Sequence, residues 1–204
     1  MSVDYTDSAR QTLVAGGHEQ VRTVYKTTNG GTTWTNIGAS IPSDSTGFSS
    51  QTYVINAQTY LLAVTSGYVN GTAGIYRTTN GGASWTKVST LGPDNALLVT
   101  SDGTFYWRSN TGTLGISTDQ GQNWTSIGST ISYQPVQIPD GRLVTIQNGR
   151  LAISADRGAN WTAFGPNLPY NPNAFNYSAG TNAYYISHFD CSGKVSNDAI
   201  EKLQ

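Results

Sequence analysis

The sequence is poor in the residues that several classes of protein require. It contains a single cysteine, Cys191, among 204 residues, which excludes an intrachain disulfide and a zinc site built from cysteines. Charged residues make up 11% of the chain, the formal net charge is −1 and lysine and arginine form no cluster. A nucleic-acid partner is therefore not expected. No run approaches the roughly 18–20 apolar residues of a membrane helix, so no membrane insertion is expected either.

Motifs for cofactors and metals are also missing. No phosphate-binding loop, no Ser-His-Asp order and no metal-ligand spacing stands out, so we expect no cofactor and no metal. The amino terminus has no signal-peptide core. The chain is rich instead in Gly (23) and Tyr (12, against 5 Phe), which is typical of a loop-rich all-β protein with a neutral polar surface. This composition favours an extracellular protein whose signal has been removed, or a piece of a longer one.

One motif of eight residues occurs four times. It reads Ser/Thr, any residue, Asp/Asn, any residue, Gly, two further residues and Trp, and it contains four of the five tryptophans. Internal repeats of this kind determine the architecture of a chain. The third, fifth and eighth positions are Asn29, Gly31 and Trp34; Asn80, Gly82 and Trp85; Asp119, Gly121 and Trp124; and Asp156, Gly158 and Trp161.

Each copy of the motif predicts a tight β-hairpin. Alternating apolar and polar residues precede and follow it, as in two strands joined by a turn. The Asp or Asn can accept hydrogen bonds from backbone N–H groups of the turn, and the Gly allows a positive φ. The Trp then covers the hairpin and buries about 200 Å².

The motif resembles the Asp-box, or BNR repeat, of sialidase-like and other glycan-active β-propellers. The resemblance implies an all-β propeller of four-stranded antiparallel blades in which the motif itself has a structural role. We expect one domain over residues 1–204, with blade units at about 1–38, 50–89, 95–128, 134–165 and 172–204. In the second unit, for example, the strands are expected at 52–56, 60–65, 74–78 and 84–88.

The sequence leaves the number of blades open, because the fifth unit carries no copy of the motif. Either the chain forms a five-bladed ring with an imperfect seam, or it is the carboxy-terminal part of a larger ring. The second alternative implies a companion half-ring or self-association.

The position of the motif also predicts a ligand face. If the strands of a blade are labelled A to D outwards, the motif forms the C–D turn, and propellers similar to this one bind ligands at the opposite end. The loops expected there carry aromatic, amide and charged groups, a combination that suits sugar recognition. The candidate ligand-binding residues are His18, Glu19, Arg22, Tyr68, Trp107, Arg108, His188 and Asp190.

Each candidate also has a purely structural interpretation. The two histidines fit ordinary loop positions, and Trp107 alternates with Phe105 as a core residue would. Glu19 and Arg22 can form a surface ion pair worth under about 1 kcal/mol. Asp190 fits a turn.

Three functions are compatible with the sequence. The leading one is an extracellular, lectin-like propeller that binds a glycan or oligosaccharide without catalysis, or the binding portion of a glycan-active protein. The second is a glycoside hydrolase, for which Glu19 and Asp190 are the only candidate acid pair on the predicted face. Sialidase residues are not transferred, because no Arg-Ile-Pro occurs and Arg77, Arg150 and Arg157 lie near the motif. The third is a protein-interaction or assembly propeller.

Overall fold

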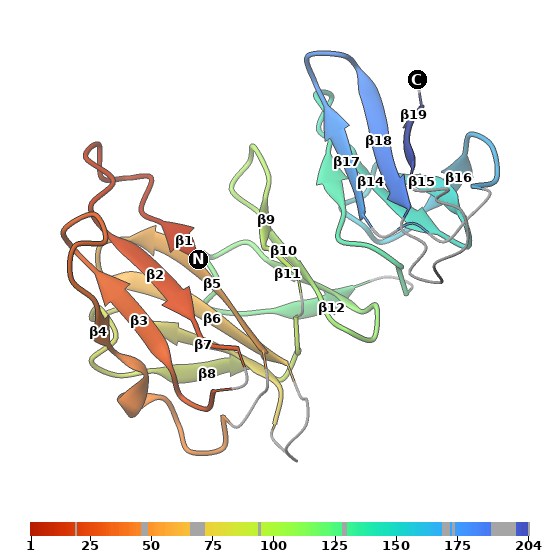
Figure 1. The fold of residues 1–204 in the computed structure, drawn as a ribbon. Helices are drawn as coiled ribbons and strands as arrows, with labels where there is room; N and C mark the ends of the chain where they lie inside the picture. Colours follow the sequence, from red (N-terminus) through yellow and green to blue (C-terminus); the bar gives the residue numbers. More distant parts are fainter. Residues whose placement is uncertain are drawn as a thin grey trace, which may run out of the picture. The chain divides into compact units, whose positions relative to one another are not determined.

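The protein forms a series of antiparallel β-sheets in a computed structural model (Figure 1). The structure describes residues 1–18, 20–45, 49–65, 72–93, 95–127, 130–168, 172, 174–188 and 199–203. Within these ranges the only helix is the 3₁₀ turn η1 (Gly38–Ser40), and no described helix is long and apolar enough to span a membrane. The predicted all-β class is confirmed.

The strands form one sheet after another along the chain, and neighbours in sequence are neighbours in each sheet. The first sheet contains β1 (Ser2–Val3), β2 (Leu13–Gly16), β3 (Val24–Thr27) and β4 (Thr35–Asn36). The second contains β5 (Ser49–Asn56), β6 (Thr59–Thr65), β7 (Gly74–Thr78) and β8 (Thr86–Ser89).

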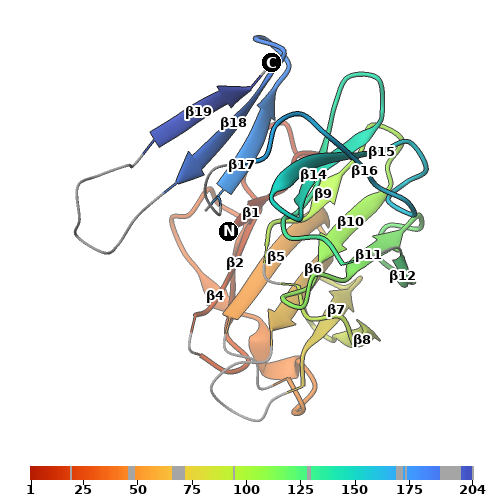
Figure 2. The same ribbon diagram turned by 90° about the vertical axis from the view of Figure 1, so that its right-hand side faces the viewer.

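The later sheets repeat this order. The third contains β9 (Leu98–Val99), β10 (Phe105–Arg108), β11 (Leu114–Ser117) and β12 (Thr125–Ile127). The fourth contains β13 (Val136–Gln137), β14 (Leu143–Gln147), β15 (Arg150–Ser154) and β16 (Thr162–Phe164). The fifth has three described strands, β17 (Ala174–Ser178), β18 (Ala183–His188) and β19 (Ala199–Leu203) (Figure 2).

The chain divides into two compact units. The first comprises Met1–Thr111 and Gly115–Ser126, and the second comprises Gly112–Leu114 and Ile127–Gln204. Each unit has its own apolar core between successive sheets. A small β-unit needs such a core because a single sheet cannot bury its apolar face alone.

The second sheet shows how these cores are built. All seven residues of β6 are buried. Tyr60, Leu62 and Val64 join one cluster with residues of the first sheet, whereas Leu61 and Ala63 join another with residues of the third. Because side chains alternate between the faces of a strand, an uninterrupted apolar run fits a strand that is covered on both faces.

The core of the second unit lies between its last two sheets. Ile146 and Leu151 of the fourth sheet and Ile186 of the fifth are buried in one cluster. At its edge the rings of Phe164 and Tyr184 meet at 63°, with centroids 5.9 Å apart. Such edge contacts add about 0.5–1.5 kcal/mol to the effect of burial.

Candidate functional site

The repeated motif folds into a turn that its own side chains stabilise. In the second copy the Thr78 hydroxyl donates to the Asn80 side-chain oxygen at 2.9 Å and accepts from the Gly82 N–H at 3.0 Å. The same Asn80 oxygen accepts from the Ser84 N–H at 2.9 Å. Equivalent bonds recur in the other three copies. Gly82 has a φ of +96°, which a residue with a side chain rarely adopts.

The third and seventh positions of the motif vary together. Where the third residue is Asn, its amide donates to a hydroxyl at the seventh position; where it is Asp, its carboxylate accepts from an Asn amide there. The pairs are Asn29–Thr33 (2.9 Å), Asn80–Ser84 (2.9 Å), Asp119–Asn123 (2.6 Å) and Asp156–Asn160 (2.8 Å). The pairing follows from the rule that a donor must face an acceptor.

The acidic copies should make stability depend on pH. The backbone N–H of Asn160, then its side-chain amide and the Ser154 hydroxyl, lower the pKa of the Asp156 carboxyl to about 2. Since the folded-state pKa lies below the ordinary value of 3.8, this stabilisation is fully present above about pH 5 and is lost as the pH falls towards 2. The double variant Asp156→Asn/Asn160→Ser, which copies Asn80 and Ser84, should lose less stability over that interval.

Urea unfolding of the wild type and the double variant at pH 5, 3 and 2 measures this difference. Parallel losses of stability between pH 5 and pH 2 in the two proteins would contradict the role assigned to Asp156. Asp119 is unchanged in both proteins, so its own lowered pKa does not affect the comparison.

In the last three copies of the motif, the fifth-position glycine also packs against the preceding repeat unit. Its close partner there is an aliphatic side chain of that unit. A Cβ built on the glycine would lie 2.8 Å from Ile37 Cβ at Gly82, 2.8 Å from Leu61 Cδ1 at Gly121, and 3.0 Å from Leu114 Cδ2 at Gly158. The motif therefore contributes to packing between sheets as well as to the turn.

Several predicted ligand-binding residues cannot be placed at a site. Glu19, Tyr68 and Asp190 lie outside the described residues, and with them the proposed acid pair. His188 is the last residue of β18, where only its backbone is described. His18 is exposed in the loop after β2, and Arg108, half-buried, ends β10.

Trp107 lies in the core of the first unit. Its side chain is 0% exposed, and its Nε1–H donates to the Asn95 carbonyl at 2.6 Å. Its ring packs against the Trp124 ring with centroids 6.0 Å apart. The structure thus makes Trp107 a core residue, the interpretation that its alternation with Phe105 also allowed. Its ring offers no free face for stacking on a sugar.

Arg22 contacts the 3₁₀ turn that follows the first sheet. Its guanidinium donates to the Ala39 carbonyl of η1, and the residue has a φ of +53°. It also lines a narrow space of about 10 Å³ beside Ile41 and Leu62, which is too small for a ligand. Its contacts hold a loop against the sheet.

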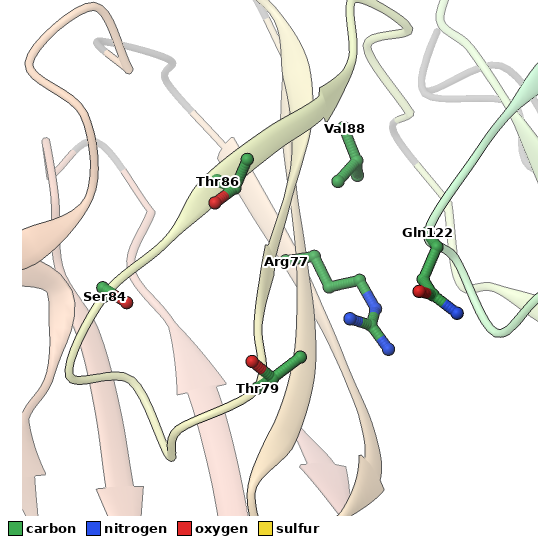
Figure 3. A pocket seen from close by; sticks show the side chains of 6 residues that line it. All are labelled: Arg77, Thr79, Ser84, Thr86, Val88 and Gln122. Carbon is green, nitrogen blue, oxygen red and sulfur yellow. The ribbon is translucent and has the colours of Figure 1, made fainter.

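A larger polar pocket lies elsewhere in the first unit, at the end of the sheets that carries the motif turns. It has a volume of about 280 Å³ and is lined by Arg77, Thr79, Ser84, Thr86, Val88 and Gln122. Figure 3 shows the Arg77 side chain extending from β7 towards Gln122, which belongs to the motif turn of the third sheet. The pocket thus combines three hydroxyls, an amide and a guanidinium with one aliphatic side chain.

This pocket was not part of the sequence prediction, which assigned only a structural role to the end of the blades that carries the motif. A signal was present, however, in the repeat. The residue before the first position of the motif is Ile116 or Ile153 in the last two copies but Lys26 or Arg77 in the first two. Two copies of the repeat form the strand with isoleucine at this position. The strand itself therefore does not require a charged residue there.

A further hollow lies on the fifth sheet. It has a volume of about 250 Å³ and is lined by Ala174, Phe175, Asn176, Tyr185 and Ser187. Asn176 and Tyr185 are opposite each other on β17 and β18, so they share one face of the sheet. An aromatic ring beside an amide and a hydroxyl also suits a sugar. The residues that line this hollow carry no charge.

Comparisons with known proteins indicate the family. A family model described as the DUF6242 beta propeller domain matches residues 39–187. A search of curated protein sequences found no match.

Solved structures of similar fold include three larger proteins. YCF48 bound to D1 peptide has a TM-score of 0.58 at 20% identity, over 81% of this chain and 55% of that one. The GH74 enzyme from Niastella koreensis has a TM-score of 0.59 at 21% identity, over 99% and 29%. The GH74 xyloglucanase from Xanthomonas campestris has a TM-score of 0.64 at 18% identity, over 99% and 36%. The chain thus spans between about a third and about half the length of these structures, and the likeness concerns the fold.

Proposed function

Because the chain belongs to the DUF6242 beta propeller domain family, we propose that it is a carbohydrate-binding propeller of the Asp-box type that acts outside the cell without catalysis. The observation that carries the proposal is the pocket around Arg77. Its hydroxyls, amide and guanidinium provide several fixed hydrogen-bonding groups, and ligand sites orient their ligands with a few such groups. The extracellular location rests on the composition of the chain.

The chemistry of the pocket favours binding over hydrolysis. Glycoside hydrolysis commonly needs two carboxylates on either side of the bond that is cleaved. None of the described residues that line the pocket is an aspartate or a glutamate. The fold of GH74 enzymes is similar, but a pocket lined in this way has no general acid to protonate a leaving group.

A glycan array probed with the 204-residue chain tests the proposal, followed by titration calorimetry on the glycans that bind. We expect Thr86→Val to weaken binding roughly 2- to 10-fold, because one neutral hydrogen bond is lost without a change of shape. Thr86 is exposed on β8, so the variant should fold.

Thr35→Val is the matched control, because Thr35 occupies the same repeat position on β4 and is also exposed but does not line the pocket. Equal losses of affinity in the two variants would show that the pocket is not the binding site. An array without signal above background would contradict glycan binding itself.

Protein recognition is the second candidate. It is favoured by one observation, the YCF48 structure of similar fold that holds a peptide. A pull-down with immobilised chain, repeated with Thr86→Val, separates the two candidates: a protein partner whose capture is unaffected by a glycan excess supports this second function.

A further inference from the structure

Arg77 carries a positive charge that the described part of the protein does not neutralise. Among the described residues, ion pairs join Lys87 to Asp44 and Arg142 to Asp140, and none includes Arg77. Its one described hydrogen bond runs from Nε to the Gln120 carbonyl at 3.3 Å. This bond orients the guanidinium and leaves both terminal nitrogens, Nη1 and Nη2, as donors.

The equivalent residue of the first sheet shows that this arrangement is particular to the pocket. Lys26 occupies the same repeat position, and its ammonium lies 5.3 Å above the centre of the Tyr60 ring. A cation over an aromatic face is stabilised by the ring. Lys26 therefore has a partner within the fold, whereas Arg77 lines an open pocket.

The neighbours of Arg77 offer further hydrogen bonds to a ligand. Thr79 and Thr86 have no hydrogen-bond partner for their hydroxyls among the described residues, and both line the pocket. The Ser84 hydroxyl accepts from the Asn80 amide at 2.9 Å, which leaves its own hydrogen to donate. Gln122 donates from Nε2 to the Asp119 carbonyl at 3.0 Å, which leaves its side-chain oxygen to accept.

We propose that this pocket binds the carboxylate of an acidic sugar, a uronic acid residue of a glycan, with Arg77 as the carboxylate contact. Two parallel donors at the end of a guanidinium match the two oxygens of a carboxylate. The Thr79, Thr86 and Gln122 side chains then bond the hydroxyls of the sugar ring, and Val88 contacts its C–H groups. The inference rests on the proposed glycan-binding function and specifies its ligand.

The test uses the 204-residue chain and titration calorimetry with four probes. These are a galacturonic acid tetrasaccharide, its methyl ester, a galactose tetrasaccharide and a sulfated galactose tetrasaccharide. We expect the acid to bind roughly 10- to 100-fold more tightly than its ester, as the loss of a charge-assisted hydrogen bond predicts. Because the ester keeps the shape of the sugar, the comparison isolates the charge.

Two variants assign the effect to Arg77. Arg77→Ile, which places the residue of positions 116 and 153 at this point of the repeat, should bind the acid as weakly as the wild type binds the ester. Lys26→Ile removes one positive charge at the equivalent position of the first sheet and should leave the affinity unchanged. Arg77→Lys keeps the positive charge but lacks the two parallel donors of the guanidinium, and should bind the acid with intermediate affinity. If Arg77→Ile unfolds, the proposal is tested by comparing the acid with its ester and Arg77→Lys with the wild type.

The outcomes separate this inference from the proposed function. Equal affinity for the acid, the ester and the galactose probe would overturn the carboxylate assignment and leave glycan binding intact. Tighter binding of the sulfated probe than of the acid would indicate that the pocket prefers a sulfate to a carboxylate, and would overturn the carboxylate assignment. Equal losses in Arg77→Ile and Lys26→Ile would overturn the role of Arg77. Absence of binding to all four probes and to the glycan array would overturn both proposals.

Discussion

Replacing Gly82 by alanine should destabilise the protein by about 2–5 kcal/mol. A left-handed backbone conformation costs a residue with a side chain about 1–2 kcal/mol, and Gly82 has a φ of +96°. The added Cβ would also lie 2.5 Å from Ile37 Cδ1 and 2.8 Å from Ile37 Cβ. Overpacking of this kind adds about 1–3 kcal/mol. Urea unfolding, followed by tryptophan fluorescence, measures the loss.

The repeat provides the matched control, because Gly31 occupies the same position with the same φ of +96°. A Cβ there would meet only the Trp34 ring, at 3.8 Å, which is an ordinary contact. Gly31→Ala should therefore cost only the backbone strain of about 1–2 kcal/mol. If the two variants lose the same stability, the packing of the glycine against the neighbouring sheet contributes nothing.

Replacing Trp107 by alanine should lower the free energy of unfolding by about 3–5 kcal/mol. The ring is fully buried among Leu61, Ala63 and Ile75, and its removal leaves a cavity that surrounding side chains only partly fill. The Nε1–H bond to the Asn95 carbonyl is lost as well. Urea unfolding at neutral pH again gives the difference.

This variant also tests the ligand-binding role that the sequence suggested for Trp107. Trp34→Ala is the control, because Trp34 is 39% exposed and should cost clearly less than Trp107→Ala. A core residue changes stability, whereas a stacking residue changes affinity. If Trp107→Ala keeps its stability and loses glycan binding, the assignment of Trp107 to the core is wrong.

The strand that leads into the motif could be predicted closely. The expected strand at 74–78 coincides with β7 (Gly74–Thr78), because an alternating run leads directly into a turn with a defined start. The inner strands were less accurate: 52–56 was expected where β5 covers Ser49–Asn56. Their ends are set by pairing with a neighbouring strand, and no local motif marks them.

The candidate site could not be predicted in the same way. Arg77 is recognisable in the sequence as a departure from the repeat, but its pocket also needs Gln122, which belongs to the next sheet. The burial of Trp107 depends similarly on Leu61 and Ala63, which belong to the second sheet and pack against it. The alternation of residues shows that a side chain points to one face, not what covers that face.

The sequence by itself determined the four hairpin turns, the role of their Asp or Asn as hydrogen-bond acceptor and the all-β class. These features depend on bonds within eight residues, such as those joining Thr78, Asn80 and Gly82, and local bonds can be read from local spacing. The tertiary structure alone decided that Trp107 is buried and that Arg77 lines a polar pocket. Both outcomes depend on contacts between strands far apart in the chain, and no spacing within a single repeat contains them.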